Sequence, residues 1–552
     1  MKNKVLKVGF LGGVGEIGKN MTFVEYANDI IIIDCGLTFP SQEMPGVDLV
    51  IPDVSYLVSN KQKIRGLFLT HGHEDHIGAV PYFLRDLGVP INVYGTKMTL
   101  ALLETRIKEF GVSNYRLNQV KPRDEINAGV FRVEFINVNH SISGSCALSI
   151  TTPVGVIVHS GDFKIDLTPI NDRLMDITRL SEIGKRGCLL LMCESTNVER
   201  AGYTMSESVV GTTLERLFSE NLKRRLIIAT FSSNVQRLQQ IINISAKFRR
   251  KVALLGRSLV KVVDVAAKIG ELSVPKNVLI DVDKIKNYPD KEIVVISTGS
   301  QGEPMSALTR MAGDDNSQIS IGENDTIIIS ASPIPGNERS IYHVINNLYK
   351  KGAEVVYDSI EKIHVSGHAC QEELKILHSI LKPKFFIPVH GEYRHLKKHA
   401  KLAAEMGLKD HQMIIAEIGD TVLVTPKTIK KGDRIPAGSR FVDGYNIDDS
   451  TSATVRDRRR LAEEGLIVVL LTVSAESGEI LQRPDVIARG VTLGDEQMED
   501  VKEIIEKVVC SFDLKSQGDL GEVKKKIRSS VRNYLNKRSK NNPMILPLIT
   551  EL

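Results

Sequence analysis

The hydrophobic positions of the first 200 residues fall in short, β-branched runs that are separated by glycine-rich turns and polar loops. Runs of this length and composition are typical of buried strands, whereas apolar positions that recur every three to four residues indicate a helix. The predicted strands lie at 30–33, 67–69, 131–138 and 154–158, and the segment 97–110 is predicted to be helical.

From about residue 206 the pattern changes to longer helices that alternate with uninterrupted apolar runs. Strands of a parallel sheet have this character because helices cover both of its faces. We therefore predict an inserted α/β domain with buried parallel strands, which lie at 226–229, 252–255, 293–296 and 326–329.

The remainder of the chain predicts one more strand of the first domain and a small C-terminal α/β module. A strand at 384–389 follows the insert, and the segment 427–439, which is rich in Lys, Gly and Pro, is interpreted as a linker or a hairpin. Beyond it we expect strands at 466–473 and 544–549 and amphipathic helices at 495–512 and 521–537.

Composition places the chain among ordinary globular proteins. Its 552 residues exceed what one hydrophobic core supports, so two or three domains are expected. The net charge of +5 permits an anionic substrate without requiring one. Six widely spaced cysteines without a CxxC pair argue against disulfides and against a thiolate zinc site. Because no apolar run approaches 18 residues and the start lacks a signal-peptide core, we expect a cytoplasmic protein without a membrane span.

The segment 69–78 carries the strongest chemical signal in the chain. His71, His73, Asp75 and His76 occupy six positions directly after an apolar, strand-like run, and Gly72 permits the turn between them. Imidazole and carboxylate are ligands that zinc and similar cations prefer. The alternative is a polar loop that happens to be rich in histidine, but three of only 13 histidines lie here. We interpret the segment as half of a metal site.

Three later strand ends carry candidate ligands for the other half. His140, Asp162 and His390 each stand where an apolar run meets a loop. Any one of them alone would more often be structural. The glycines at 13–18 fit GxGxxG superficially, but no acidic residue follows at the distance that a dinucleotide site requires, so nucleotide binding of that kind is rejected.

Short motifs recur in a fixed order along the chain, and together with the segment 69–78 they carry a family resemblance. They occupy residues 12–20, 161–164, 194–197, 229–234, 298–304, 332–337, 364–368 and 543–547. In these motifs the chain resembles the bacterial ribonuclease J family, in the β-CASP branch of the metallo-β-lactamase superfamily, over essentially its whole length.

The resemblance implies the fold class and its division into domains. The expected fold is α/β: a metallo-β-lactamase αββα sandwich with an inserted β-CASP α/β domain and a small C-terminal α/β domain. The implied boundaries are 1–205 and 355–430 for the sandwich, 206–354 for the insert, 431–448 for a linker and 449–552 for a C-terminal domain of the dimerisation type.

The resemblance also implies a set of metal ligands. One ion would be held by His71, His73 and His140, the other by Asp75, His76 and His390, with Asp162 bridging the two. Two zinc ions per subunit are expected, with manganese as the alternative because nitrogen and oxygen ligands do not decide between them. In this fold the glycine loop at 12–18 is expected to shape the floor of the active site.

The resemblance also implies catalytic and substrate-binding residues. His368 and Glu194 are the candidates for positioning the substrate or donating a proton, and Glu194 could equally orient a metal histidine. A pocket for a 5′ phosphate is expected from Ser233, Asn234, His364, Val365, Ser366, Gly367 and His368, although serines in such segments also cap turns. Four basic residues are expected along the RNA backbone: Lys164, Arg237, Arg257 and Arg310.

The implied function is that of a metal-dependent ribonuclease. It would degrade single-stranded RNA from 5′-monophosphate ends in the 5′→3′ direction and also cut internally, in rRNA maturation and mRNA decay. A homodimer or tetramer is expected, with an RNA-decay complex as a further candidate partner. Two alternative functions fit the sequence less well. A small-molecule hydrolase such as a thioesterase or lactonase would not need the phosphate-binding insert, and a non-catalytic scaffold subunit would not need seven intact ligands.

Overall fold

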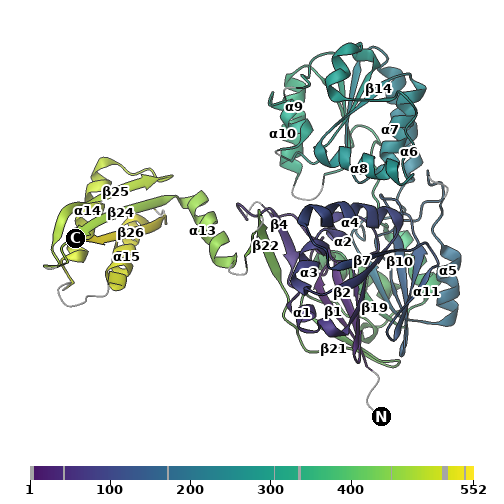
Figure 1. Cartoon of the computed structure of the whole chain (residues 1–552), viewed down its shortest axis with the longest axis horizontal. Coiled ribbons are helices and arrows are strands. Elements are labelled where there is room, and N and C mark those ends of the chain that lie inside the picture. Colours follow the sequence, from purple (N-terminus) through teal and green to yellow (C-terminus); the bar gives the residue numbers. More distant parts are fainter. Residues whose placement is uncertain are drawn as a thin grey trace. The chain divides into compact units, whose positions relative to one another are not determined.

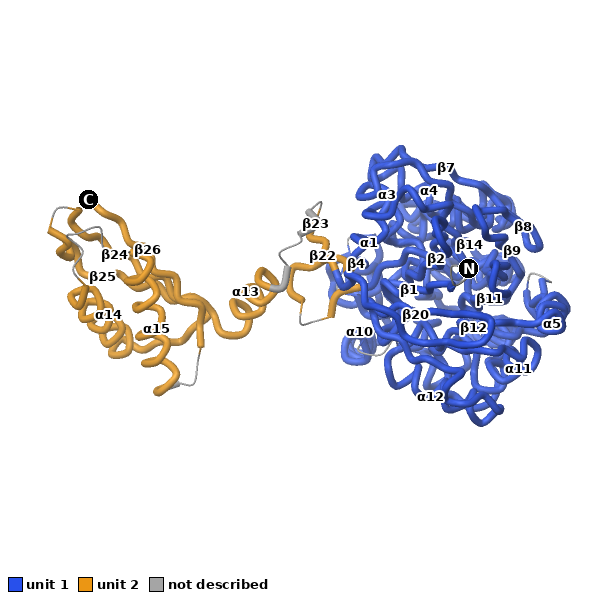
Figure 2. The backbone as a smooth tube through the Cα atoms, turned by 90° about the horizontal axis from the view of Figure 1, so that it is seen from below, with its two compact units in different colours: residues 1–38, 51–439 blue, residues 39–50, 440–552 orange. Residues whose placement is uncertain are grey.

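The computed structural model of the chain describes residues 5–41, 44–170, 173–303, 305–316, 318–333, 337–444, 446–448, 451–475, 477–512, 520–539 and 542–552. Pro304 and residues 334–336, which belong to two of the family motifs, lie outside the described residues, as do residue 445 of the predicted linker and residues 449–450 at the start of the predicted C-terminal domain. The chain divides into two compact units, one of residues 1–38 and 51–439 and the other of residues 39–50 and 440–552 (Figure 2).

The first sheet of unit 1 has eight strands in the order β21-β20-β1-β2-β3-β5-β6-β7. Its strands are β1 (Leu6–Gly12), β2 (Met21–Tyr26), β3 (Asp29–Ile33), β5 (Ile64–Phe68), β6 (Ile91–Gly95), β7 (Tyr115–Gln119), β20 (Thr421–Val424) and β21 (Ile429–Lys431). The strands β3, β5, β6 and β7 run parallel to one another, so the loops after β3 and β5 leave the same edge of the sheet.

The second sheet has six strands in the order β19-β12-β11-β10-β9-β8. Its strands are β8 (Glu125–Ala128), β9 (Phe131–Asn137), β10 (Cys146–Thr152), β11 (Gly155–His159), β12 (Cys188–Glu194) and β19 (Phe385–Val389). Phe10 and Phe68 of the first sheet share one buried core with Phe135, Leu190 and Ile387 of the second. The two sheets therefore pack face to face and bury their apolar sides against each other.

Helices cover the outer faces of this sandwich. The helices α5 (Ile177–Arg186), α11 (Gln371–Leu381) and α12 (Tyr393–Glu405) pack on the second sheet, where Leu180, Leu377 and Ala403 join a core with Leu191 and Phe386. The helices α3 (Val80–Leu87) and α4 (Lys97–Phe110) lie beside the parallel strands of the first sheet. The predicted αββα arrangement is confirmed, as is the helix expected at 97–110.

The insert forms a separate six-stranded sheet in the order β15-β14-β16-β13-β17-β18, and all of its pairings are parallel. Its strands are β13 (Arg225–Thr230), β14 (Lys251–Leu255), β15 (Leu279–Ile280), β16 (Ile293–Ser297), β17 (Asp325–Ser330) and β18 (Glu354–Tyr357). The four buried parallel strands predicted from the apolar runs are confirmed.

Helices flank this sheet on both sides (Figure 1). The helices α6 (Glu207–Glu220), α7 (Val235–Lys247) and α8 (Arg257–Lys268) pack on one face, and α9 (Ala307–Ala312) and α10 (Glu338–Lys350) on the other. Each face has its own apolar core, which explains why the central residues of these strands are apolar at consecutive positions rather than at alternate ones.

The segment 427–439 is a hairpin in part, because β20 and β21 pair as antiparallel strands at the edge of the first sheet. Part of the predicted linker at 431–448 is also regular: β22 (Ser439–Asp443) pairs with β23 (Asn446–Asp448). The predicted boundaries between domains stay a prediction, but the residues between them are more structured than a linker requires.

Unit 2 has a three-stranded sheet in the order β25-β24-β26, with one face covered by two helices. Its elements include α13 (Thr451–Glu464), β24 (Leu466–Val473), β25 (Ile480–Arg489), α14 (Asp495–Val509), α15 (Leu520–Ser539) and β26 (Met544–Glu551). Both predicted strands and both predicted helices are present, whereas α13 and β25 were not predicted. Among the described residues, none of the helices combines the length and the hydrophobicity that crossing a bilayer requires.

Candidate metal centre

The histidine-rich segment begins where β5 ends, and a buried carboxylate beside it fixes its course. Asp34 follows β3, and its Oδ1 accepts a hydrogen bond of 2.8 Å from the Thr70 amide. Its Oδ2 accepts a second bond of 2.7 Å from the Thr70 hydroxyl. Asp34 itself has φ of 57°, in the left-handed region that non-glycine residues seldom adopt. The parallel pairing of β3 and β5 thus places the ligand-bearing loop at a defined edge of the sheet.

Three histidines form the first group of candidate ligands. His71 Nε2 lies 3.1 Å from His73 Nδ1, and His140 Nε2 lies 3.1 Å from the same atom. Burial lowers the pKa of His73 to about 4 and holds the pKa values of His71 and His140 well below their usual range. All three rings are therefore neutral near pH 7 and present lone pairs to a common point.

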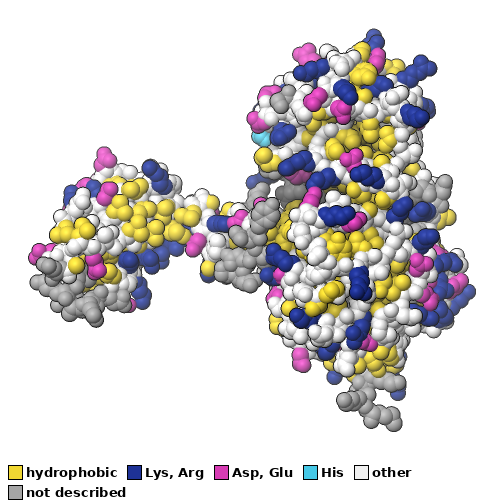
Figure 3. Space-filling view, viewed as in Figure 1, with side chains coloured by type: hydrophobic (Ala, Val, Ile, Leu, Met, Phe, Trp, Pro, Cys, Tyr) yellow, Lys and Arg dark blue, Asp and Glu magenta, His cyan; other side chains and the backbone are white. Residues whose placement is uncertain are grey.

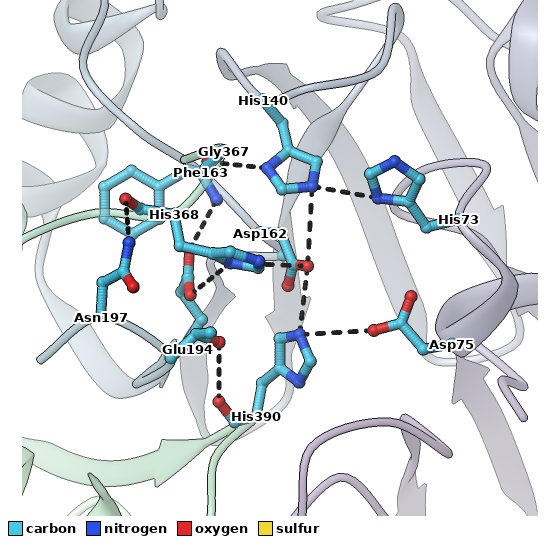
Figure 4. Close-up of polar contacts among 12 residues, drawn as sticks. His73, Asp75, His140, Asp162, Phe163, Glu194, Asn197, Gly367, His368 and His390 are labelled. Carbon is cyan, nitrogen blue, oxygen red and sulfur yellow. Dashed lines mark hydrogen bonds and ion pairs between the residues drawn. The ribbon is translucent and has the colours of Figure 1, made fainter. Parts of the chain in front are cut away.

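A second group combines two carboxylates with two histidines. His390 Nε2 and His76 Nε2 each lie 3.5 Å from Asp75 Oδ2 and 3.2 Å from Asp162 Oδ2. The same Asp162 oxygen lies 3.6 Å from His71 Nε2 and 3.8 Å from His140 Nε2, in the first group. Asp162 is thus the residue that both groups share (Figure 4).

The electrostatics of the second group differ from those of the first. Burial opposes ionisation of Asp162, but His390 and His76 outweigh it and hold its pKa well below the usual range. Burial likewise opposes the charged form of His76, yet Asp162, Asp75 and Asp34 together raise its pKa well above the usual range. The pKa of Asp75 is also lowered, because His76 and His390 outweigh its burial. The group carries ionised carboxylates around a protonated imidazole.

Hydrogen bonds on the far side of two rings fix which nitrogen faces the site. His76 Nδ1 lies 2.7 Å from Asp34 Oδ2, and His140 Nδ1 lies 2.7 Å from the carbonyl oxygen of Gly367. When each Nδ1 donates its proton there, Nε2 faces the cluster. In His140 it does so as a lone pair, and in His76 it becomes one once the second proton of that ring is displaced. Orientation of a ligand histidine by a carboxylate or a carbonyl is typical of metal sites.

The turn that carries His390 is attached to the glycine loop after β1. The His390 amide donates a hydrogen bond of 2.6 Å to the carbonyl of Gly13, and Glu16 forms a bridge with Gly391. His390 has φ of 51°, a strained backbone that this contact helps to hold. The glycine loop therefore supports a candidate ligand.

His368 and Glu194 lie beside the ligand cluster and contact each other. His368 Nδ1 donates to Glu194 Oε2 over 2.9 Å and lies 3.8 Å from Asp162 Oδ2. Glu194 Oε1 accepts a 2.9 Å bond from the amide of Phe163, the residue after Asp162. Burial would lower the pKa of His368, but Glu194, Asp162 and Asp75 raise it to about 9. The Glu194 carboxylate thus orients His368 and holds the amide that follows Asp162.

The segment 364–368 approaches the first group closely. A Cβ at Gly367 would lie 2.6 Å from the His140 ring, so only glycine fits there. Ser366 Oγ accepts bonds of 2.8 Å from Asn197 Nδ2 and 3.2 Å from the His368 amide. Val365 is buried, and burial together with Arg237 lowers the pKa of His364 to about 3.

The residues expected to complete the phosphate pocket from the insert have a local role. Asn234 caps α7, because its Oδ1 accepts a 3.0 Å bond from the Arg237 amide. Ser233 is half-buried in the turn that precedes this helix. Asn234 thus has a capping role, which was the alternative considered for the serines, and the substrate contacts of Ser233 and Asn234 stay a prediction.

Two of the four basic residues predicted to contact RNA are buried instead. Arg237 is fully buried, pairs with Glu207, and donates a 3.0 Å bond to the Ile363 carbonyl. Lys164 is buried as well and lies 3.3 Å from Asp166 Oδ2. Both predictions are wrong because a basic residue that anchors a loop has the same local sequence signature as one that binds phosphate. Arg257 is exposed at the start of α8, and Arg310 is half-buried in α9.

The seven converging side chains have the chemistry and the spacing of metal ligands. Zinc–nitrogen bonds of about 2.0–2.1 Å in a tetrahedral site put neighbouring ligand nitrogens about 3.3 Å apart. This is close to the 3.1 Å between His73 Nδ1 and His140 Nε2. Asp162 Oδ1 and His390 Nδ1 are buried without a hydrogen-bond partner in the described part of the chain. Buried polar atoms are rarely left in this state unless a further group satisfies them or their surroundings.

The fold and the site define a metallo-hydrolase of the metallo-β-lactamase superfamily with a β-CASP insert. Residues 14–186 match the metallo-β-lactamase superfamily and 223–348 match the β-CASP domain of ribonuclease J. Residues 352–414 match the Zn-dependent metallo-hydrolase RNA specificity domain and 453–552 the ribonuclease J C-terminal domain. Together with relatives named ribonuclease J that are 39% identical over 98% of this chain, these matches show that the chain belongs to the ribonuclease J family, as predicted, and is a metal-binding ribonuclease.

The relatives span nearly the whole chain. Ribonuclease J2 of Bacillus subtilis is 39% identical over 547 residues, which cover 98% of both chains. Ribonuclease J of Thermus thermophilus is 39% identical over 548 residues, which cover 98% of this chain and 94% of that one. A crystal structure of a protein of unknown function from Enterococcus faecalis V583 aligns with a TM-score of 0.53 at 18% identity, covering 76% of this chain and all of the other. That likeness shows the fold alone.

Proposed function

We propose that the chain is a two-metal 5′→3′ exoribonuclease that prefers RNA with a 5′-monophosphate end and also cuts internally. The observation that carries the proposal is the contact between the Gly367 carbonyl and His140, which puts a glycine-flanked, hydroxyl-bearing loop directly beside the ligand cluster. A phosphate held by that loop would lie within reach of the groups that cleave the next phosphodiester bond.

In this proposal His71, His73 and His140 hold one ion, Asp75, His76 and His390 hold the other, and Asp162 contacts both. The five imidazoles favour zinc, with manganese as the alternative. When bound, the cations supply Lewis acidity that makes water a nucleophile near neutral pH and neutralises charge on the phosphoryl oxygens.

The remaining chemistry falls to His368 and Glu194. Cleavage needs a proton for the departing 3′ oxygen, and the raised pKa of His368 keeps a proton on its ring at neutral pH. Glu194 accepts the hydrogen bond from Nδ1, so Nε2–H is the atom that faces the substrate. We assign His368 the role of proton donor and Glu194 that of the residue that orients it.

The proposed phosphate pocket uses the segment 364–368. The two bonds that Ser366 Oγ accepts occupy its lone pairs and turn its hydroxyl hydrogen in a third direction, where it can donate to a phosphate oxygen. His364 would contact the phosphate as a neutral donor rather than as a cation, because its pKa is lowered to about 3. Ser233 and Asn234 complete the proposed pocket from the insert.

A comparison of 5′ ends tests this proposal. Purified protein is incubated with RNA that bears a 5′ monophosphate, triphosphate or hydroxyl, with and without a chelator, and the products are resolved from 5′ and 3′ labels. We expect metal-dependent release of mononucleotides, fastest from the monophosphate. Ser366→Ala should slow this release more than internal cutting; equal losses would contradict the end pocket. Intact RNA beside rapid hydrolysis of a thioester or lactone would instead support a small-molecule hydrolase.

We further propose a homodimer or tetramer in which unit 2 supplies a contact surface. The face of its sheet opposite the helices carries exposed apolar side chains, and the strand register brings Leu470, Ile487, Leu546 and Leu548 together there. Apolar side chains gather over these strands in Figure 3. Such a face is typical of an interface between subunits. Leu546→Glu with Leu548→Glu should give monomers in light scattering, and an unchanged mass would contradict the assignment.

We also propose the RNA substrates, the cellular role and the location of this activity. Action on single-stranded RNA, with roles in rRNA maturation and mRNA decay, follows from the family and the proposed 5′-end preference. The match to an RNA specificity domain covers residues 352–414, which include His368 and His390. We keep the domain boundaries at 205, 354, 430 and 448, a cytoplasmic location and association with an RNA-decay complex as parts of this proposal.

A further inference from the structure

A second buried carboxylate, Glu373, links the same two chain segments that Glu194 links. Its side chain is fully buried at the third position of α11. Oε1 accepts a 2.7 Å hydrogen bond from the Ile165 amide, and Oε2 accepts bonds of 2.7 Å from the Thr204 amide and 2.8 Å from the Cys370 amide. None of these contacts belongs to the metal ligands or to the proposed phosphate pocket.

A helix cap explains only one of these three bonds. In a capping box, the glutamate at the third helical position accepts a bond from the amide of the residue before the helix, here Cys370. Ile165 and Thr204 are 208 and 169 residues away in the sequence and contribute nothing to such a cap. Ionised carboxylates are buried only where several donors compensate for lost water, and here the donors come from three separate segments.

Two of the three segments carry groups of the active site. Ile165 lies three residues after Asp162, and the amides of Phe163, Lys164 and Ile165 are held in turn by Glu194, the Asn139 carbonyl and Glu373. Cys370 lies two residues after His368. The Asp162 segment and the His368 segment are therefore joined twice, through a side chain by Glu194 and through the backbone by Glu373.

The third segment extends this link to His368 itself. The hydroxyl of Thr204 donates a 2.7 Å hydrogen bond to the His368 carbonyl, and Asn197 Nδ2 donates one of 3.0 Å to the same oxygen. The loop at 200–202 also accepts bonds from the first amides of α11, at Gln371 and Glu372. Glu373 thus sits at the junction of the loops that fix where the His368 ring points.

We propose that Glu373 is a positioning residue that holds His368 in register with Asp162, through the Ile165 amide on one side and through Cys370 and Thr204 on the other. This inference rests on the proposed function, in which His368 gives a proton to the leaving oxygen. It assigns Glu373 no contact with RNA or metal: its role is to keep the donor at the correct distance from the scissile phosphate, to which the rate of proton transfer is sensitive.

The variant Glu373→Gln separates this role from the helix cap. One glutamine oxygen can occupy the Oε2 position and keep the Thr204 and Cys370 bonds, while the amide nitrogen then faces the Ile165 amide and the tie to the Asp162 segment is lost. The expected result is a kcat about 10-fold lower, with KM for RNA and bound metal unchanged, the size of effect that residues supporting a metal-site ligand typically show. Glu372→Gln, whose carboxylate is exposed and pairs with Lys375, is the matched control and should keep the wild-type kcat.

A double-mutant cycle with His368→Ala decides whether Glu373 acts through His368. If it does, Glu373→Gln should change kcat by less than about 2-fold in the His368→Ala background, since the group it positions is gone. An equal fractional loss in both backgrounds, or a wild-type kcat for Glu373→Gln beside an impaired His368→Ala, would overturn this inference alone. A wild-type rate for His368→Ala would instead refute the proposed donor and the inference with it.

Should Glu373→Gln fail to fold, as thermal unfolding would reveal, Thr204→Val tests the same link from its other end. It removes the hydroxyl bond to the His368 carbonyl and keeps the Thr204 amide on Glu373. A fall in kcat of about 3-fold that vanishes in the His368→Ala background supports the inference, and an unchanged kcat overturns it.

Discussion

The two groups of ligand-type side chains share Asp162 but differ in charge. His71, His73 and His140 are neutral imidazoles whose pKa values burial lowers. In the other group, carboxylates surround His76 and raise its pKa. A cation entering the first group meets lone pairs without a proton to displace, whereas one entering the second gains more charge stabilisation but must displace the proton of His76. Two sites that draw ligands from the same loop can thus differ in affinity and in pH dependence.

The largest expected effect comes from the residue that the groups share. Asp162→Ala should remove both ions and lower the rate by on the order of 10³-fold or more, because several kcal/mol of transition-state stabilisation depend on them. Elemental analysis and RNA cleavage measure the two losses. Glu74→Gln, in the same loop but with a solvent-exposed side chain, is the control. Two ions retained in Asp162→Ala would refute the bridging assignment.

Substitutions that change one ligand group at a time sharpen the comparison. Asp75→Ala should lower the metal content from two ions to one and spare the first group, while His73→Ala should do the opposite. Each should reduce cleavage by on the order of 10²-fold or more, since one cation cannot stabilise both the attacking and the leaving oxygen. If either variant loses both ions, the two groups do not bind metal independently.

A smaller effect is expected when Asp34, the hydrogen-bond partner of His76, is substituted. Asp34→Asn keeps the size of the side chain but weakens the bond that orients the His76 ring, so metal affinity should fall by about 10–100-fold. Titration with a competing chelator measures the change, and excess metal should restore cleavage. Affinity equal to that of the wild type would show that the ring is held by its packing alone.

The smallest expected effect is on the number of protons that are released when metal binds. Because the pKa of His76 is raised well above its usual range and those of the first group are lowered, filling the second group near pH 7 should release more protons than filling the first group. The sign follows: affinity at the second group falls as the pH falls, with little change at the first. Calorimetric titration in buffers of different ionisation enthalpy counts the protons, and equal release in wild type and Asp75→Ala would contradict this assignment.

Much of the fold could be predicted from the sequence because its signals are local. Apolar runs of strand length gave the insert's buried strands, and a loop with three of 13 histidines marked the ligand cluster. β25 was missed because Pro484 interrupts a mostly polar segment, which is tolerated since this strand lies at the edge of its sheet.

The supporting residues of the site could not be predicted in this way. A glutamate that accepts three backbone amides, such as Glu373, has the same sequence signature as one on the surface of a helix. Asp34 directly follows the strand predicted at 30–33, and nothing nearby in sequence indicates its bonds to Thr70 and His76. Arg237 was assigned to RNA although it is buried against Glu207. These contacts join segments that only the folded chain brings together.

The attachment of the His390 turn to the Gly13 carbonyl has a consequence for biosynthesis. A nascent chain cannot close its ligand set until residue 390 has left the ribosome and folded back onto the segment that was translated first. Products of premature termination upstream of that point therefore lack one wall of the centre and are inert toward the transcripts around them.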